Sequence, residues 1–478
     1  MYQADNLTIK SGISGLVLME AAGRGIATHI QDNWPAGRCL VLCGPGNNGG
    51  DGYVVARYLS EAGWQVDLFS VTDPNVLKGD AASMRDRWKG GVQEIESPDF
   101  KNHDLVVDAI FGAGFSRELP ADISKLLSSI AEAKIPVVAV DIPSGVNGDT
   151  GGVDPGAIPA ATTVSFFLAK PGHFLYPGRG YCGHLEIVDI GIDEKTLEAI
   201  SPQAQQNDPC LWVSYLRRAD PLDQKYSRGH TAIVGGGISS TGAARLAARA
   251  SLRAGAGATT IISPPGALTT YAAALEAVMV ASVADEETFR DWISKKRIGT
   301  LLVGPGNGLG DRTRTLAMAS LQSNATVVLD ADALTVFKND PETLFATIKS
   351  KTEGACILTP HEAEFSRLFG LSGSKLERAR AAAILSGAII LLKGADTVIA
   401  APDGQAIINH NAPPYLATAG SGDVLGGIIC GLLSSGMPAF LAAAAAAWIH
   451  GDAGNSLGPG MIAEDIEAEI PAILAGFS

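Results

Sequence analysis

A glycine-rich segment in the second half of the chain has the residue types needed for phosphoryl chemistry. Thr418-Ala419-Gly420-Ser421-Gly422-Asp423 precedes a long apolar run. Gly420 and Gly422 leave backbone N–H groups bare at a predicted helix N-terminus, where they can bind phosphate oxygens and developing negative charge. Asp423 can accept a proton from a hydroxyl group that attacks a phosphate. The alternative is that the glycines only allow helix packing and that Asp423 only caps the helix.

Other polar segments of this half follow predicted strands. Lys393-Gly394-Ala395-Asp396-Thr397 offers a positive charge and a hydroxyl group to a nucleotide. Residues 330–334 and 358–364 also follow strands, and His361 in the latter is placed to meet a substrate. Because the chain has no GxxxxGK[ST] sequence, a P-loop mechanism is excluded.

A second glycine-rich segment lies in the first half. Gly44, Gly46 and Gly49 match the dinucleotide fingerprint GxGxxG after a predicted strand, and Asp67 lies close to where a ribose-binding acid is expected. These residues alone would indicate a dehydrogenase. The same spacing recurs at residues 178–183 without a predicted helix, which shows how weak the pattern is.

The polar residues around this segment suggest a more specific site. Asn47, Asn48 and Asp51 add polar side chains to the predicted loop, and Asp108 and Asp141 lie at the ends of two further strands. The carboxyl ends of parallel strands converge on one crevice. Oxygen atoms there could hold a hard monovalent cation, and a second carboxylate could move protons. The alternative makes Asp108 a turn residue and Asp141 a cap.

The elements that position these residues follow from hydrophobic periodicity. Residues 11–29, 53–62 and 123–133 have helical spacing. Continuous apolar strands between helices imply a parallel sheet covered on both faces, hence a Rossmann-like three-layer α/β domain. The predicted strands are residues 39–43, 66–69, 105–109, 137–140 and 164–168.

A polar segment around residues 201–209 is suited to a linker and predicts domains at 1–209 and 220–478. A new α/β pattern then runs to the end of the chain. The apolar stretch 424–449 is interrupted at 434–438, which predicts two buried helices rather than a membrane span of about 20 residues. The predicted strands here are residues 231–234, 259–262, 301–303, 327–329, 356–358 and 389–392.

Composition narrows the classes of function. The 478 residues have a formal net charge of −14 and no long basic run, which argues against nucleic acid as a partner. The six cysteines include no CxxC pair, which argues against a structural zinc site, and free thiols suit a reducing cytoplasm. The N-terminus lacks the features of a signal peptide. We expect a cytoplasmic, homo-oligomeric enzyme with neither nucleic acid nor membrane as a partner.

The segments of the first half together resemble the NAD(P)H-hydrate epimerase domain, over about residues 1–209. The match rests on residues 18–20, 47–52, 107–112, 141–146 and 170–172. Members of this family interconvert the R and S hydrates at carbon 6 of the nicotinamide ring.

The resemblance implies which residues of this half transfer a proton, bind potassium and line the hydrate site. Asp141 is the candidate for proton transfer, and Asn48, Asp108 and Ser144 are the implied potassium ligands. The residues implied to line the hydrate site are Asn47, Asn48, Gly49, Gly50, Asp51, Gly112, Ala113, Gly114, Phe115, Ser116, Arg117, Glu118 and Asp141.

The second half resembles the ribokinase superfamily, and more closely its NAD(P)H-hydrate dehydratase branch, over about residues 226–478. The match rests on residues 235–237, 240–243, 304–306 and 359–364, besides the segment that ends at Asp423. In that branch a nucleotide phosphorylates the 6-hydroxyl group of the S hydrate, and elimination of phosphate restores the dihydronicotinamide. Bacterial members generally use ADP and eukaryotic members ATP.

This resemblance implies that Asp423 is the catalytic base and that magnesium accompanies ADP or ATP. The turn after Gly306 is longer than in the family, so which glycine of residues 304–310 touches the ligand stays open. The implied hydrate contacts are Ala243, Gly306, His361 and Asp423, and the implied nucleotide contacts are Lys393, Gly394, Ala395, Asp396, Thr397 and Gly422.

The two halves point to one pathway, because a dehydratase that takes only the S hydrate needs an epimerase to rescue the R form. Two other functions stay open from the sequence. One is an NAD-dependent dehydrogenase, which leaves Gly422 and Asp423 unexplained. The other is a ribokinase-like small-molecule kinase with an N-terminal binding module.

Overall fold

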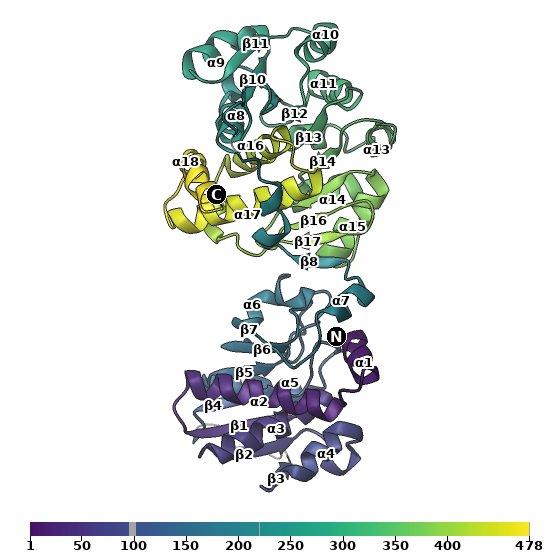
Figure 1. Ribbon diagram of the computed structural model, residues 1–478, viewed down its shortest axis with the longest axis vertical. Helices are drawn as coiled ribbons and strands as arrows, with labels where there is room; N and C mark the ends of the chain where they lie inside the picture. Colours follow the sequence, from purple (N-terminus) through teal and green to yellow (C-terminus); the bar gives the residue numbers. More distant parts are fainter. Residues whose placement is uncertain (95–101, 219, 478) are drawn as a thin grey trace. The chain divides into compact units, whose positions relative to one another are not determined.

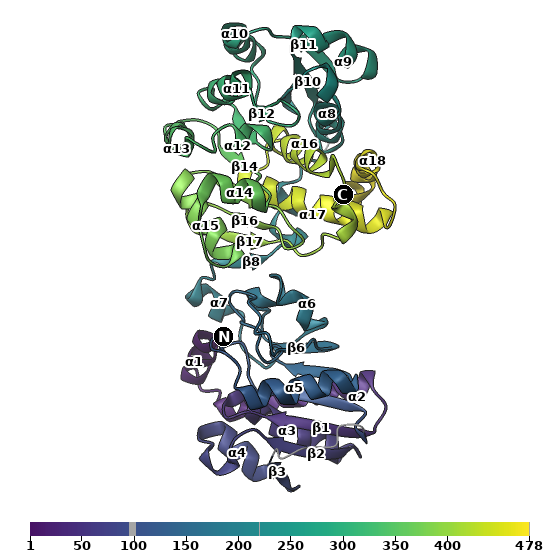
Figure 2. The ribbon, with the colours of Figure 1, turned by 180° about the vertical axis from the view of Figure 1, so that it is seen from behind.

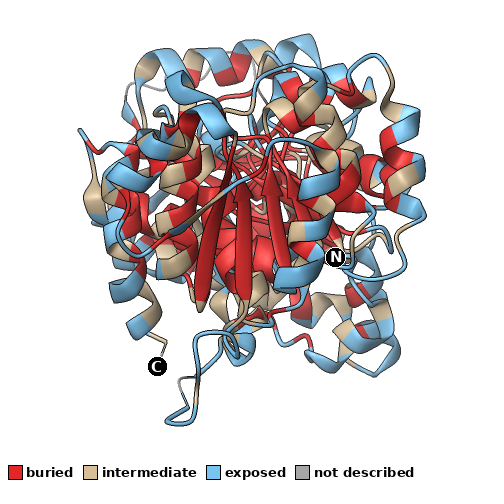
Figure 3. Ribbon diagram, turned by 90° about the horizontal axis from the view of Figure 1, so that it is seen from above, coloured by how far each residue is buried: buried red, intermediate tan, exposed pale blue. Residues whose placement is uncertain are grey.

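The computed structural model describes residues 1–94, 102–218 and 220–477, which form two compact units, Met1–Pro202 and Gln203–Ser478 (Figures 1 and 2). Each unit is built around its own sheet. In both units, buried residues follow the strands and the helix faces turned toward them, whereas the outer helix faces are exposed (Figure 3).

The sheet of the first unit has its strands in the order β3-β2-β1-β4-β5-β6-β7, all parallel. The order reverses between β1 and β4. The loops that follow these two central strands therefore border a crevice at the carboxyl ends of the strands. The strands are β1 (Arg38–Cys43), β2 (Gln65–Ser70), β3 (Val92–Glu94), β4 (Leu105–Ala109), β5 (Val137–Val140), β6 (Thr162–Phe166) and β7 (His184–Val188).

Helices cover both faces of this sheet, which confirms the predicted three layers. Alternate β1 side chains separate two apolar cores: Cys39, Val41 and Cys43 pack toward α2 (Gly15–Asn33), α3 (Asn47–Glu61) and α4 (Gly79–Arg87). Leu40 and Leu42 pack toward α5 (Ala121–Ala133) on the other face. The shorter helices are α1 (Tyr2–Lys10), α6 (Arg179–Cys182) and α7 (Lys195–Ile200).

The second unit has a ten-stranded sheet in the order β11-β10-β9-β12-β13-β14-β15-β16-β17-β8. Strands from β11 to β15 are parallel, and β16 is antiparallel to both neighbours. The order reverses between β9 and β12. The strands are β8 (Ala204–Gln206), β9 (His230–Val234), β10 (Ala258–Ser263), β11 (Met279–Ser282), β12 (Thr300–Val303), β13 (Thr326–Leu329), β14 (Cys356–Leu358), β15 (Ile389–Leu392), β16 (Val398–Ala400) and β17 (Ala406–Ile408).

Small residues allow the helices on one face of this sheet to pack closely. In α16 (Ser421–Ser434), a side chain at Gly427 or Gly431 would collide with the backbone of α8 (Gly242–Arg253). The apolar stretch forms two buried helices as predicted, α16 and α17 (Ala439–Leu457), and no described helix is both long and apolar enough to span a membrane. The other helices are α9 (Leu268–Ala274), α10 (Glu286–Lys296), α11 (Asp311–Leu321), α12 (Asp332–Thr335), α13 (Pro341–Lys349), α14 (Glu362–Phe369), α15 (Lys375–Ser386) and α18 (Ala463–Ala475).

The segment predicted as a linker differs in the structure, because residues 203–212 belong to the second unit. Strand β8 pairs with β17 and covers the edge of the sheet. The Asn207 side chain donates to Asn409 Oδ1 and to the Ala444 carbonyl, both at 2.8 Å, and Trp212 is fully buried. An edge strand needs only backbone pairing, so its polar sequence reads like a loop.

Candidate active sites

The loops after β1 and β4 are in direct contact in the first unit. A side chain at Gly44 would collide with the Ile110 carbonyl, so glycine is required there. Helix α3 begins at Asn47, earlier than predicted, and the polar residues 47–51 therefore lie in its first turns rather than in a loop. Gly49 packs against the Gly44 backbone, which lets the helix start directly after the strand.

Asp141 is the centre of a polar cluster at this crevice. Its Oδ1 atom accepts from Lys170 Nζ at 2.6 Å and from Ser165 Oγ at 2.8 Å, and its Oδ2 atom accepts from the Ala113 amide at 2.9 Å. Burial raises the pKa of Asp141, but the Lys170 ammonium and the hydrogen bonds from Lys170, Ala113 and Ser165 together lower it to about 2. Asp141 is therefore a positioned anion, and its backbone has a left-handed φ of 67°.

The predicted potassium ligands Asp108 and Ser144 contact each other. Ser144 donates to the Asp108 carboxylate from its amide at 2.8 Å and from its hydroxyl at 2.7 Å, and Ser144 Oγ accepts from the Phe111 amide at 2.9 Å. Asp108 is buried and forms no ion pair with any described side chain. Burial raises its pKa, so a nearby cation would favour its charged form.

Asn48 and Asp141 approach Gly112 from different elements. A Cβ atom at Gly112 would lie 3.0 Å from Asn48 Oδ1 and 3.1 Å from Asp141 Oδ2. The Asn48 Nδ2 atom is buried without a hydrogen-bond partner among the described residues. Carboxylate, amide and hydroxyl oxygens are the ligands that hard cations prefer, so the donor set of Asn48, Asp108 and Ser144 fits potassium.

The structure does not bring all the predicted hydrate residues together. Gly112 and Ala113 lie against Asp141, whereas Ser116 and Glu118 are exposed. Phe115 stacks on Phe111 with ring centroids 4.4 Å apart, and the Arg117 guanidinium lies within 6 Å of both rings. The predicted Asn47 is also exposed, at the very start of α3.

Helix α1 contributes residues that the sequence did not predict. A side chain at Gly114 would collide with the Tyr2 hydroxyl, so α1 lies over the loop after β4. Asp5 is close enough to Asp141 and Lys170 for their charges to act on it. The helix gives no motif of its own, so no sequence signal identified it.

Asp67, which supported a dehydrogenase, is engaged elsewhere. Its Oδ2 atom forms an ion pair with Arg38 at 2.8 Å and contacts His103 Nε2 at 2.9 Å. A ribose-binding carboxylate must be free to accept the ribose hydroxyl groups. The structure therefore removes Asp67 from the four residues that supported the dehydrogenase hypothesis.

In the second unit, the loops after β9 and β12 meet in a similar way. Ser240 Oγ donates to the Gly306 carbonyl at 2.9 Å, and a Cβ atom at Gly306 would lie 3.4 Å from the Ala243 Cβ. Gly304 instead packs against the Asp330 backbone, and Gly308 has open space around it. Of the glycines in this turn, Gly306 is the one placed beside Ala243.

The start of α16 lies beside a partly buried lysine, Lys393. Gly420 is the N-cap residue with φ of 87°, and a Cβ atom at Gly422 would lie 3.5 Å from Lys393 Nζ. Lys393 Nζ forms an ion pair with Asp330 Oδ1 at 2.7 Å. Burial raises the pKa of Asp423 to about 6, Asp330 adds to this effect, and Lys393 only partly opposes it. Asp423 can thus exchange a proton close to neutral pH.

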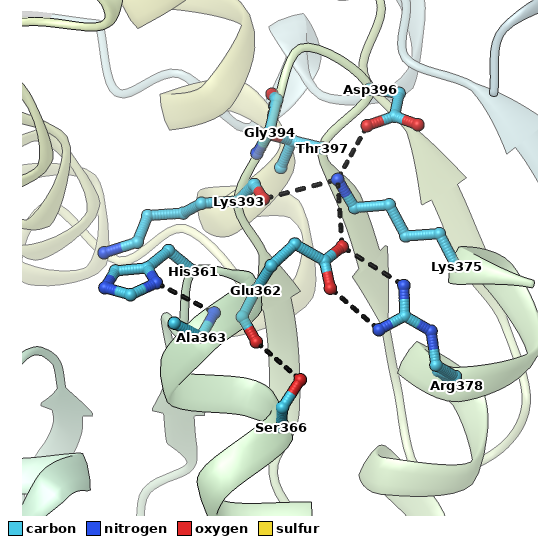
Figure 4. Close-up of polar contacts among 10 residues, drawn as sticks. All are labelled: His361, Glu362, Ala363, Ser366, Lys375, Arg378, Lys393, Gly394, Asp396 and Thr397. Atoms are coloured by element: carbon cyan, nitrogen blue, oxygen red, sulfur yellow. Dashed lines mark hydrogen bonds and ion pairs between the residues drawn. The ribbon is translucent and has the colours of Figure 1, made fainter. Parts of the chain in front are cut away.

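His361 caps the N-terminus of α14 with its ring. Its Nδ1 atom accepts from the Ala363 amide at 3.1 Å, while Glu364 Oε2 accepts from the His361 amide at 2.9 Å. The side chain is half exposed. In Figure 4 the His361 ring and the Lys393 side chain extend to the same side, away from Lys375.

A network of charged side chains contacts the predicted nucleotide loop, residues 393–397, on the side away from His361 (Figure 4). Lys375 Nζ donates to Asp396 Oδ1 at 2.6 Å and to the Lys393 carbonyl at 3.3 Å, and both Lys375 and Asp396 side chains are less than 10% exposed. Arg378 binds the Glu362 carboxylate with two hydrogen bonds, at 2.7 and 3.2 Å. The Asp396 side chain therefore supports the loop. Lys375 and Arg378 look like ordinary surface charges in the sequence, so they were not predicted.

The family of each half follows from comparison with known proteins. Residues 231–471 match the family described as NAD(P)H-hydrate dehydratase, and residues 15–172 match the YjeF-related protein N-terminus family. A crystal structure of the ADP/ATP-dependent NAD(P)H-hydrate dehydratase from Bacillus subtilis, co-crystallised with ATP and Mg²⁺, is 24% identical with a TM-score of 0.51. It covers 57% of this chain and 99% of that chain, and it supports the fold of the second unit.

Whole-length relatives join the two halves. The chain is 37% identical to the bifunctional NAD(P)H-hydrate repair enzyme Nnr of Moorella thermoacetica, over 93% of this chain and 88% of that protein. It is 31% identical to the enzyme of the same name from Escherichia coli, over 97% of this chain and 90% of that protein. The predicted resemblance is confirmed, and the chain belongs to the family of bifunctional NAD(P)H-hydrate repair enzymes.

Proposed function

We propose that this chain repairs hydrated nicotinamide cofactors in two steps. The first unit interconverts the R and S hydrates of NADH and NADPH, and the second unit dehydrates the S form with ADP or ATP. The observation that carries the proposal is Asp423, a carboxylate with a raised pKa beside the open N-terminus of α16 and Lys393. A base, an anion-binding helix end and a cation are the parts that phosphoryl transfer needs.

In the second unit, Asp423 takes the proton of the 6-hydroxyl group as its oxygen attacks the terminal phosphate of the nucleotide. The backbone N–H groups of Gly422 and its neighbours bind the transferred phosphate, and Lys393 balances its charge. The 6-phosphate then leaves with its bonding electrons, and loss of a proton from carbon 5 restores the dihydronicotinamide. Magnesium bound with the nucleotide would supply further charge neutralisation.

Substrate positions in this unit follow the same proposal. Ala243 in the first turn of α8, Gly306 in the loop after β12 and His361 at the start of α14 would contact the hydrate. Residues 393–397 would hold the adenine nucleotide. The Thr397 hydroxyl binds the Gly394 carbonyl at 2.8 Å, which fixes the turn of that loop.

In the first unit, Asp141 remains the predicted proton-transfer residue of the epimerase. Asn48, Asp108 and Ser144 would hold potassium, which would orient the hydrate and balance charge in the crevice. Residues 1–202 would carry the epimerase and 203–478 the dehydratase, a boundary moved from the predicted one because β8 and Trp212 belong to the second unit. The homo-oligomeric state and the cytoplasmic location remain predictions.

The experiment that tests the proposal is incubation of the protein with mixed NADH hydrates, ADP or ATP, and magnesium, following NADH absorbance. Both epimers should be consumed, and NADH and free phosphate should form in equal amounts. A ribokinase-like kinase would instead accumulate a stable phosphorylated product without free phosphate. That product would contradict the proposed dehydratase.

A further inference from the structure

We propose that Asp51 is a second catalytic residue of the epimerase and that it works with Asp141 from the opposite side of the hydrate. Asp51 would donate a proton to the 6-hydroxyl group, and Asp141 would take a proton from the water that replaces it. The inference rests on the proposed epimerase function of the first unit.

The position of Asp51 follows from its helix. Asp51 lies three residues after Asn48, on the same face of α3, and Asn48 borders the crevice at Gly112. Asp141 borders Gly112 from the loop after β5. The two carboxylates therefore come from different elements and approach one crevice.

The two carboxylates differ in their partners. Asp141 is held by Lys170, Ser165 and the Ala113 amide. Asp51 is only 8% exposed, yet no described residue donates a hydrogen bond to its side chain, and its Coulomb interactions with Asp141 and Asp5 are repulsive. A buried carboxylate without a donor is costly as an anion and stable as a neutral acid.

The charged groups around Asp51 agree with this assignment. Burial raises the pKa of Asp51 well above its ordinary value, and Asp141 and Asp5 add to the effect, whereas Lys170 opposes it. Cys43 of β1 also faces Asp51, and burial keeps its thiol neutral. The crevice thus holds one carboxylate whose surroundings favour its protonated form and one whose surroundings favour its anion, which is how paired carboxylates divide acid and base roles.

The proposed epimerisation needs one protonated and one ionised carboxyl group. Carbon 6 of the hydrate is bonded to a hydroxyl group and to ring nitrogen N1. When Asp51 protonates the hydroxyl oxygen, the C6–O bond breaks, water leaves with the bonding electrons, and the positive charge is shared by C6 and N1. Water then adds to the opposite face, a new C6–O bond forms, and the added water gives its extra proton to Asp141. One proton leaves Asp51 and one reaches Asp141 in each inversion, and exchange with solvent water returns Asp141 to its anion and Asp51 to its acid before the next turnover. The reverse reaction uses the two residues in exchanged roles.

The low pKa of Asp141 does not prevent this step. A water molecule bonded to a carbocation is a far stronger acid than a carboxylic acid, so a weak base accepts its proton readily. The anion also stabilises the cation before water adds. Paired carboxylates flank a comparable oxygen-stabilised cation in glycoside hydrolysis.

The direct test uses pure R hydrate without nucleotide, with R-to-S conversion followed by chromatography above the spontaneous rate. Asp51→Asn should lower the epimerisation rate by about 100-fold or more, the usual effect of losing an acid catalyst. Asp122→Asn, at an exposed position of α5, is the matched control and should convert R hydrate at the wild-type rate. Dehydration of pure S hydrate by the second unit should be unchanged in both variants. An active Asp51→Asn variant would overturn the assignment, whereas an inactive wild type would contradict the epimerase function itself.

Two further measurements keep the proposal testable if Asp51→Asn fails to fold. Epimerisation in water enriched in ¹⁸O should place one labelled oxygen at carbon 6 per inversion, and inversion with retention of the original oxygen would overturn the mechanism. The wild-type rate should fall as rising pH removes the proton of Asp51. Asp5→Asn removes a like charge, so this fall should move to lower pH; a fall that stays in place would contradict the role of Asp51 as the acid.

Discussion

The two units use the same pair of residue types, aspartate and lysine, with opposite results. In the first unit, Lys170 binds Asp141 directly at 2.6 Å, and the pKa of Asp141 is about 2. In the second unit, Lys393 binds Asp330 instead, and the pKa of the nearby Asp423 is about 6. Burial raises the pKa of both aspartates. The direct ion pair with a lysine offsets this effect at Asp141, whereas at Asp423 the lysine is paired with a neighbouring carboxylate and offsets it only in part.

The largest effect is expected at the titrating aspartate. Asp423→Asn keeps the shape of the side chain but removes the base, so the dehydration rate should fall by roughly 10²–10⁴-fold. Nucleotide binding, measured by calorimetry, should persist, because Gly422 and residues 393–397 are unchanged. A variant with wild-type turnover would show that another group removes the proton.

The fixed anion should depend on its lysine for stability. Lys170→Met leaves the largely buried Asp141 carboxylate without its cation. Loss of one partner of a fully buried ion pair costs about 3–5 kcal/mol, and we expect a cost near the lower end of this range because both side chains are slightly exposed. Thermal unfolding of the first unit should therefore occur at a lower temperature. Lys134→Met, at an exposed position after α5, is the control. Equal unfolding temperatures for the two variants would mean that the Asp141–Lys170 pair contributes little.

A smaller effect on activity is expected from the residues that support the nucleotide loop. Lys375→Met removes the hydrogen bonds to Asp396 and to the Lys393 carbonyl, and charge-assisted bonds of this kind contribute about 1.5–3 kcal/mol each. The KM for ADP or ATP should rise about tenfold or more, while Asp423 keeps its role in turnover. Lys338→Met, at an exposed position, should leave KM unchanged. A loss confined to kcat would contradict the positioning role.

The sequence predicted the apolar framework well because continuous hydrophobic runs identify buried strands. Strands 105–109, 137–140, 356–358 and 389–392 lie where they were expected. It failed at β8, whose polar residues pair through the backbone, because a strand stabilised mainly by backbone pairing leaves little pattern to read. It also missed β16 and β17, two short apolar strands that are fully buried.

The candidate sites show a similar division. Glycines that accept no side chain, such as Gly44, and aspartates at strand ends, such as Asp141, follow from local sequence and strand topology. The hydrogen-bond and ion-pair partners that come from distant segments of the chain do not follow from local sequence. Nothing in the sequence joins Lys375 to Asp396, or Lys393 to Asp330, across 63 positions in the latter case.

The most direct test of the comparison is the pH dependence of dehydration in the wild type and in Asp330→Asn. The wild-type rate should rise with pH as Asp423 loses its proton, with a midpoint near its pKa of about 6. In Asp330→Asn a repulsive charge is removed and Lys393 is freed to interact with Asp423, so the midpoint should move to lower pH. A midpoint that stays in place, or moves to higher pH, would contradict the claim that the partner of the lysine sets the behaviour of the aspartate.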